Sequence, residues 1–127
     1  MHKGCKTVDP LSINKLYTFF GKRFERGYFF KGESHDFYEV VCVLSGTVGI
    51  TAGKNVFKLK DGEMTFHPPG EFHAIRDEDK CSPEVIIFSF SATSFPSVAA
   101  KIFKIGEEGK REIADILKKV TKYFVKN

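Results

Sequence analysis

Residues 32–39 read Gly-Glu-Ser-His-Asp-Phe-Tyr-Glu, and residues 62–73 read Gly-Glu-Met-Thr-Phe-His-Pro-Pro-Gly-Glu-Phe-His. Both stretches set histidine and glutamate among residues that favour β-strands. His35 and Glu39 are four residues apart, so on one strand they point to the same face. His73 follows a Pro-Pro-Gly turn and begins a further strand. These spacings predict that His35, Glu39 and His73 come together.

The neighbours of His35 and Glu39 are apolar, because Phe37, Val41 and Val43 share their face of the predicted strand. Charged groups in such surroundings need a partner, a ligand or a metal. Two imidazoles and a carboxylate form a metal site with open positions. They also form the polar end of a pocket for a sugar or a small acid, or a hydrogen-bonded cluster that caps the core.

Short β-rich runs extend to both sides of these stretches, with turn residues such as Ser45-Gly46, Asp61-Gly62 and Pro68-Pro69-Gly70 between them. Many short strands with turn residues between them, and no alternation with helices, predict an all-β sandwich or barrel. The predicted strands are residues 16–20, 28–30, 37–44, 47–51, 56–60, 63–67, 72–76, 84–91 and 101–105.

The period changes near the C-terminus. Apolar residues recur at the spacing of one helix face over residues 107–125, namely Ile113, Ile116, Leu117, Val120 and Phe124. This amphipathic helix buries its stripe either on its own barrel or against a second copy in a homodimer. We therefore expect an N-terminal arm (1–15), a β-barrel (16–105) and a C-terminal helix (106–127).

Composition excludes several classes of protein. The 127 residues suit one domain. A net charge of +4 is spread along the chain and makes no nucleic-acid stripe. The three cysteines form no Cys-x-x-Cys pair, which argues against a zinc ribbon and favours the reducing cytoplasm. We expect neither a signal peptide nor a membrane span, because no apolar run is long enough.

The two stretches resemble the two cupin motifs. The first motif is matched by Glu39 with Gly46 seven positions later, and the second by Gly62, Pro68-Pro69-Gly70 and His73. The resemblance implies a double-stranded β-helix barrel, jelly-roll-like, followed here by the amphipathic helix.

The cupin resemblance also implies a metal set. Carried over, the ligands are His35, Glu39 and His73, with Glu33 standing where the family has its first histidine. Asp77 stands where the second motif ends in asparagine. Such a set implies a divalent ion, Zn, Mn, Fe or Ni, although the change at Glu33 weakens the metal interpretation.

Residues 35–46 and 59–73 further resemble the N-terminal ligand-binding domain of AraC-family transcription regulators, a similarity that covers residues ~28–92. The resemblance implies a barrel that senses a small molecule, sugar-like or a small acid, and helices that form a dimer. The candidate ligand-binding residues are then Glu33, His35, Phe37, Glu39, His67 and His73.

Members of that family continue into two helix-turn-helix units, and none fits between the predicted helix and Asn127. We therefore expect an excised sensor and dimerisation domain, or a stand-alone cupin, that does not bind DNA specifically by itself. The alternative function is a metal-dependent cupin enzyme, a dioxygenase or isomerase, with metal held by His35, Glu39 and His73.

Overall fold

The computed structural model describes residues 12–94 and 101–125, which form nine β-strands and one α-helix. Each predicted strand is present, and the predicted helix begins one residue earlier than expected. The elements are β1 (Ser12–Arg23), β2 (Phe29–Glu33), β3 (Tyr38–Ser45), β4 (Thr47–Ala52), β5 (Asn55–Lys60), β6 (Glu63–His67), β7 (His73–Arg76), β8 (Glu84–Ser94), β9 (Ile102–Lys104) and α1 (Gly106–Val125).

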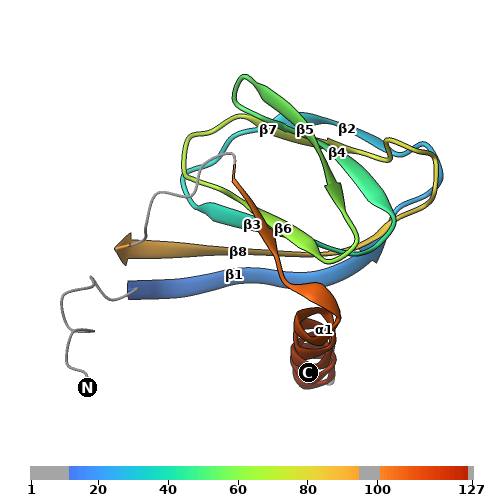
Figure 1. The fold of residues 1–127 in the computed structure, drawn as a ribbon. Helices are drawn as coiled ribbons and strands as arrows, with labels where there is room; N and C mark the ends of the chain where they lie inside the picture. Colours follow the sequence, from blue (N-terminus) through green and yellow to red (C-terminus); the bar gives the residue numbers. More distant parts are fainter. Residues whose placement is uncertain (1–11, 95–100, 126–127) are drawn as a thin grey trace, which may run out of the picture.

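The strands form two antiparallel sheets that face each other (Figure 1). Sheet A has the order β1-β8-β3-β6-β9, and sheet B has the order β2-β7-β4-β5. From β5 to β8 the chain alternates between the sheets, because β5 and β7 belong to sheet B and β6 and β8 to sheet A. This winding is that of a jelly roll, and it confirms the predicted all-β cupin barrel.

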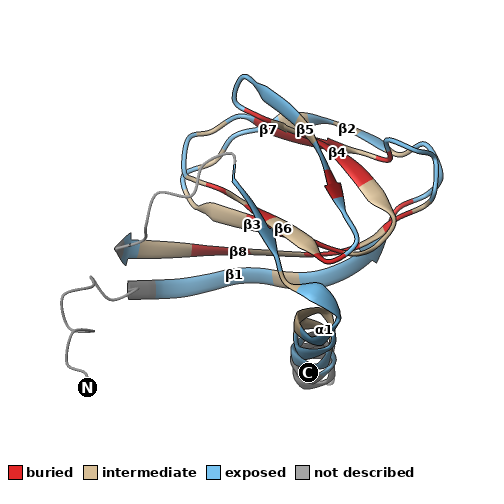
Figure 2. Cartoon of the chain, viewed as in Figure 1, coloured by how far each residue is buried: buried red, intermediate tan, exposed pale blue. Residues whose placement is uncertain are grey.

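The core fills the space between the sheets with β-branched side chains, which suit a pleated, buried surface. Figure 2 shows buried segments on β4, β7 and β8. The largest contributors are at most 2% exposed, and each stabilises the fold by about 1.5–3 kcal/mol. They are Val41, Val43, Val48, Ile50 and Leu59. Phe30 and Ile87 pack against this cluster.

The loop at residues 77–83 is organised by one buried carboxylate. Asp77 is 5% exposed, and its two oxygens accept backbone N–H bonds from Gly27 (2.9 Å), Cys81 (2.9 Å) and Ser82 (3.0 Å). These bonds tie the β7–β8 loop to the β1–β2 turn. The residue at the position of the motif asparagine therefore has a structural role here.

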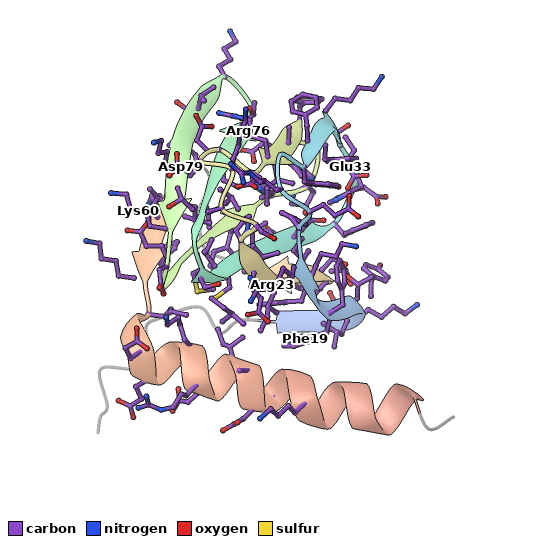
Figure 3. All side chains as sticks on the ribbon, turned by 90° about the vertical axis from the view of Figure 1, so that its right-hand side faces the viewer. Phe19, Arg23, Glu33, Lys60, Arg76 and Asp79 are labelled. Atoms are coloured by element: carbon purple, nitrogen blue, oxygen red, sulfur yellow. The ribbon has the colours of Figure 1, made fainter. Side chains whose placement is uncertain are left out.

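The helix lies outside sheet A, next to β1 (Figures 1 and 3). The Lys110 ammonium donates to the Leu44 carbonyl oxygen at 3.1 Å and also contacts the Asp61 carboxylate. The beginning of α1 therefore packs on the barrel of the same chain, whereas Ile116, further along the helix, is 48% exposed. The side chains of Leu117, Val120 and Phe124 lie outside the described ones.

Two expectations differ from the structure. Residues 12–15 of the expected arm belong to β1, because β8 pairs with β1 back to Ser12, and residues 1–11 lie outside the described ones. His35 does not share a strand with Glu39 but lies between β2 and β3, where its ring bonds the Phe37 carbonyl. Within the described residues, no helix is both long and apolar enough to cross a membrane.

Candidate functional site

Two glutamates and two histidines from four segments come together where the sheets face each other. Glu33 ends β2 (labelled in Figure 3), His35 follows it, Glu39 lies on β3 and His73 begins β7. The register explains the meeting, because Glu33 pairs with His73 in sheet B and Glu39 pairs with His67 in sheet A. One ligand-type atom from each of the four lies within 4.8 Å of the others. We call these four residues the His/Glu cluster.

A β-bulge turns Glu33 towards this cluster. In a regular strand Phe30, which lines the barrel cavity, and Glu33 would face opposite sides. The pairing of β2 with β7 shifts between these two residues. Gly32 lies within the shift at a φ of +125°, and a Cβ there would overlap the Phe72 ring. Only glycine therefore fits at position 32, because other residues rarely adopt this φ and their Cβ would overlap the Phe72 ring.

Both histidines of the cluster present Nε2 to the carboxylates. His35 Nδ1 lies 3.1 Å from the Phe37 carbonyl oxygen, and His73 Nδ1 lies 3.0 Å from that of Glu71. A carbonyl only accepts, so each Nδ1 carries hydrogen and donates it. In the neutral ring Nε2 then keeps a lone pair. Outer hydrogen bonds of this kind orient histidines that bind metals.

The Nε2 atom of His73 is buried, and no described residue forms a hydrogen bond with it. It lies 3.4 Å from an oxygen of Glu39 and 3.7 Å from one of Glu33. His35 Nε2 is 3.3 Å from Glu39 and 3.5 Å from Glu33. Lone pairs that face carboxylates need a cation between them, either a proton or a metal ion.

The spacing of the cluster fits a metal ion. Ligands at about 2.1 Å on opposite sides of an ion are about 4.2 Å apart, so separations of up to 4.8 Å need only a small contraction. The donor set, two imidazoles and two carboxylates, suits Zn, Mn, Fe or Ni.

Charges within the cluster favour a bound cation. Burial raises the pKa of Glu39, but His73, His67 and His35 outweigh burial and lower that pKa below its usual value. Burial lowers the pKa of His73, but Glu39, the Glu71 carbonyl and Glu33 outweigh it and raise that pKa. Glu39 is therefore ionised at neutral pH, and the carboxylates attract positive charge onto His73.

His67 contacts His73 but does not belong to the cluster of four. Its ring stacks on His73 with the centroids 4.4 Å apart, and its Nδ1 lies 2.9 Å from a Glu71 carboxylate oxygen. Burial, and then the charge of His73, lower the pKa of His67 to about 4, so its ring is neutral at pH 7. His67 therefore supports the ring of His73.

A cavity of about 620 Å³ lies beside the cluster, within the size range of small-molecule pockets. Of the six predicted ligand-binding residues, Glu33, His35, Phe37 and Glu39 line this cavity. His67 and His73 do not line the cavity, although His73 belongs to the cluster. The Phe37 ring stacks on His35 with the centroids 3.9 Å apart and so fixes the imidazole.

The strand register arranges the sheet A side of the cavity in three layers. Paired residues share a face, as the 2.6 Å bond between the Thr18 and Ser89 hydroxyls confirms. The layers are Thr18–Ser89–Glu39, then Phe20–Ile87–Val41, then Lys22–Val85–Val43. Four residues of β8 separate the first layer from the third, which is about 13 Å at about 3.3 Å per residue.

Sequence patterns did not identify the contribution of β1 to this cavity. Thr18, Phe20, Lys22 and Phe24 all line it. These four residues alternate with a period of two, but the predicted strand covers only residues 16–20 and so omits Lys22 and Phe24. The face could be assigned only once β8 was known as the partner strand.

Comparison with known proteins identifies residues 19–114 with a family model described as the AraC-like ligand binding domain. Comparison with curated proteins finds no match. The cupin domain of Schizosaccharomyces pombe Cnp3 is similar in structure, with a TM-score of 0.54 at 16% identity over 64% of this chain and 61% of that one. A Thermus thermophilus protein also gives 0.54 at 16% identity, over 72% of this chain and 96% of that one.

A cupin superfamily protein of Desulfitobacterium hafniense gives a TM-score of 0.50 at 19% identity, over 57% of this chain and 63% of that one. The match spans less than two thirds of the Cnp3 and Desulfitobacterium chains. At these identities the solved structures support the cupin fold alone. The family model covers most of the chain, and on that basis the protein belongs to the AraC-like ligand-binding domain family.

Proposed function

We propose that the protein is the effector-sensing domain of an AraC-like transcription regulator and binds a small molecule inside its barrel. The observation that supports this most is the cavity of about 620 Å³, with apolar walls and the His/Glu cluster on one side. Apolar walls with a few convergent polar groups are typical of small-molecule sites.

Signalling would follow from a population shift. β1 contributes to the cavity wall through Thr18 and Phe20, and the same strand lies next to α1. A ligand that favours one position of β1 therefore biases α1 or the segment before β1. Through a homodimer formed by α1, that bias would change how DNA-binding modules elsewhere in a full regulator are presented.

Blocking the cavity tests this function. Ile87→Phe adds volume inside the cavity, whereas Val56→Phe adds it at a position that is 64% exposed. Thermal unfolding would be followed with L-arabinose, D-glucose, phenylacetate and citrate. We expect one of these probes to raise the Tm of the wild type and Val56→Phe but not of Ile87→Phe. Equal shifts in both variants, or none with any probe, would contradict cavity binding.

We further propose that the His/Glu cluster holds a divalent cation. The buried Nε2 of His73, which has no hydrogen-bond partner among the described residues, supports this, as does the matching Nδ1 donation of the two rings. A bound ion would supply Lewis acidity beside the cavity. The side chains of Glu33, His35, Glu39 and His73 would hold it, with His67 supporting His73.

The same cluster favours a second function, a metal-dependent cupin enzyme of the dioxygenase or isomerase kind. A two-histidine carboxylate site with open positions suits oxygen or enediol chemistry. Protein that is metal-free after mild purification and takes up no Fe, Mn or Zn would dismiss the enzyme and leave the sensor.

A further inference from the structure

Lys22 brings a positive charge to the cavity wall, away from the His/Glu cluster. It alternates with Phe20 and Phe24 along β1, and it pairs with the buried Val85, so its side chain leaves the strand on the cavity face. Among the described residues, none forms an ion pair or a hydrogen bond with Lys22. The next residue, Arg23, leaves the strand on the other face and pairs with Glu84 at 3.1 Å.

Between Lys22 and the cluster the cavity wall is apolar. Phe20 and Ile87 form the middle layer on sheet A, and Phe30 pairs with Ile75 on sheet B. Two of the hydroxyls that line the cavity, on Thr18 and Ser89, already bond each other at 2.6 Å, and Tyr28 brings one further hydroxyl. A sugar, which presents hydroxyls on all sides, would leave most of them unpaired here, at a cost for each.

Charge sets the direction in which a ligand would lie. The cluster end carries two carboxylates, Glu33 and Glu39, about 13 Å along the strands from the Lys22 layer. The two carboxylates cancel the charge of a bound divalent ion, so the cluster end is close to neutral with the ion and negative without it. The ammonium of Lys22 is a positive charge without an ion pair to any described residue in either state, and it attracts an anionic group. The apolar layer between these two ends suits a ring or a short hydrocarbon body.

We propose that the cavity binds a small organic acid with an apolar body, whose carboxylate pairs with Lys22 and whose body lies against Phe20, Phe30 and Ile87. The inference rests on the proposed function, a ligand inside the barrel, and names its chemical class.

Calorimetric titration with three probes, phenylacetate, its neutral isostere phenylacetamide and L-arabinose, tests the assignment. The variants are Lys22→Gln, Lys22→Arg and Lys31→Gln, the last removing the same charge from a β2 residue that does not line the cavity. We expect Lys22→Gln to weaken phenylacetate binding by tenfold or more, because a charge-assisted hydrogen bond is lost. Binding of phenylacetate by Lys22→Arg and Lys31→Gln should stay within about twofold, and binding of phenylacetamide should be equally weak in all four proteins. Circular dichroism would confirm that each variant is folded.

Three outcomes would overturn the proposal. Equal phenylacetate affinity in Lys22→Gln and wild type would mean that the carboxylate goes to the cluster instead. Binding of L-arabinose but not phenylacetate, lost in Ile87→Phe, would overturn the acid class and leave the sensing function standing. Binding of none of the three probes would overturn the acid class and also count against the cavity as an effector site.

Discussion

At the scale of single residues, Gly32 controls where Glu33 points. Its φ of +125° and the Phe72 ring above it exclude a side chain. We expect Gly32→Ala to destabilise the fold by about 3 kcal/mol, because backbone strain and overlap add. Urea unfolding measures this loss.

The matched control is Gly27→Ala. Gly27 also has a positive φ, +81°, but nothing lies within 4 Å of its added Cβ. Gly27→Ala should lower the free energy of unfolding only through backbone strain, by about 1–2 kcal/mol. Equal losses in the two variants would show that the Phe72 ring does not constrain Gly32.

Residue spacing alone predicted three members of the cluster. The motif spacing and the Pro-Pro-Gly turn predicted that His35, Glu39 and His73 meet, and the structure brings them together, although His35 and Glu39 do not share a strand as expected. The direction of Glu33 could not be derived, since it depends on a bulge that exists only when β2 pairs with β7. The support that His67 gives to His73 depends likewise on pairing between strands distant in sequence.

At the scale of loops and strands, Asp77 gives the β7–β8 loop a defined pH dependence. Burial raises the pKa of Asp77, but the N–H donors of Gly27, Cys81 and Ser82 outweigh burial and hold that pKa below its usual value. A carboxyl with a depressed pKa stabilises the fold above its unfolded pKa of about 3.9, and this stability is lost as pH falls through the folded value.

Asp77→Asn should therefore cost about 2 kcal/mol at pH 7, where one acceptor oxygen is lost. The difference from wild type should shrink as pH falls from about 4 towards 2. Urea unfolding across this range measures it, with Asp79→Asn, a change in the same loop at an exposed ion pair with Lys58, as the control. A difference that stays constant with pH would argue against the ionised form of Asp77 as the acceptor.

Lys110 connects the beginning of α1 to the barrel through hydrogen bonds and ion pairs. Its ammonium contacts the Leu44 carbonyl, Asp61 and Glu107. Lys110→Met should let this part of the helix open more often, so that amide hydrogen exchange over residues 106–112 becomes several-fold faster. Lys118→Met, a change at an exposed position of the same helix, should leave exchange as it is. Unchanged exchange in Lys110→Met would mean that apolar packing alone holds the helix.

Strand positions were largely predictable, because turn residues such as Ser45-Gly46 and Asp61-Gly62 separate them. The length of β1 was not, since its first residues are held by the partner strand β8 rather than by local propensity. For the same reason the sequence did not predict that Phe20 and Lys22 face the cavity, because their face depends on the pairing of β1 with β8.

At the scale of the whole molecule, we expect α1 to be the element that contacts a second copy. Ile116 is 48% exposed on a helix whose beginning already packs on the barrel. We expect the protein to form a homodimer through α1, and Ile116→Lys to weaken it by about tenfold or more. Sedimentation over a concentration series measures this, with Lys118→Gln as the control. Identical dimer affinity in Ile116→Lys would place the contact elsewhere.

Metal content tests the role of the His/Glu cluster most directly. Elemental analysis would be made on gently purified wild type, on His35→Ala/His73→Ala, and on Glu78→Gln, whose carboxylate pairs with Arg76 away from the cluster. We predict about one divalent ion per chain in the wild type and in Glu78→Gln, and none in the double variant. A metal-free wild type that takes up neither Zn nor Mn, or an equal metal content in all three proteins, would contradict a cation site at this cluster.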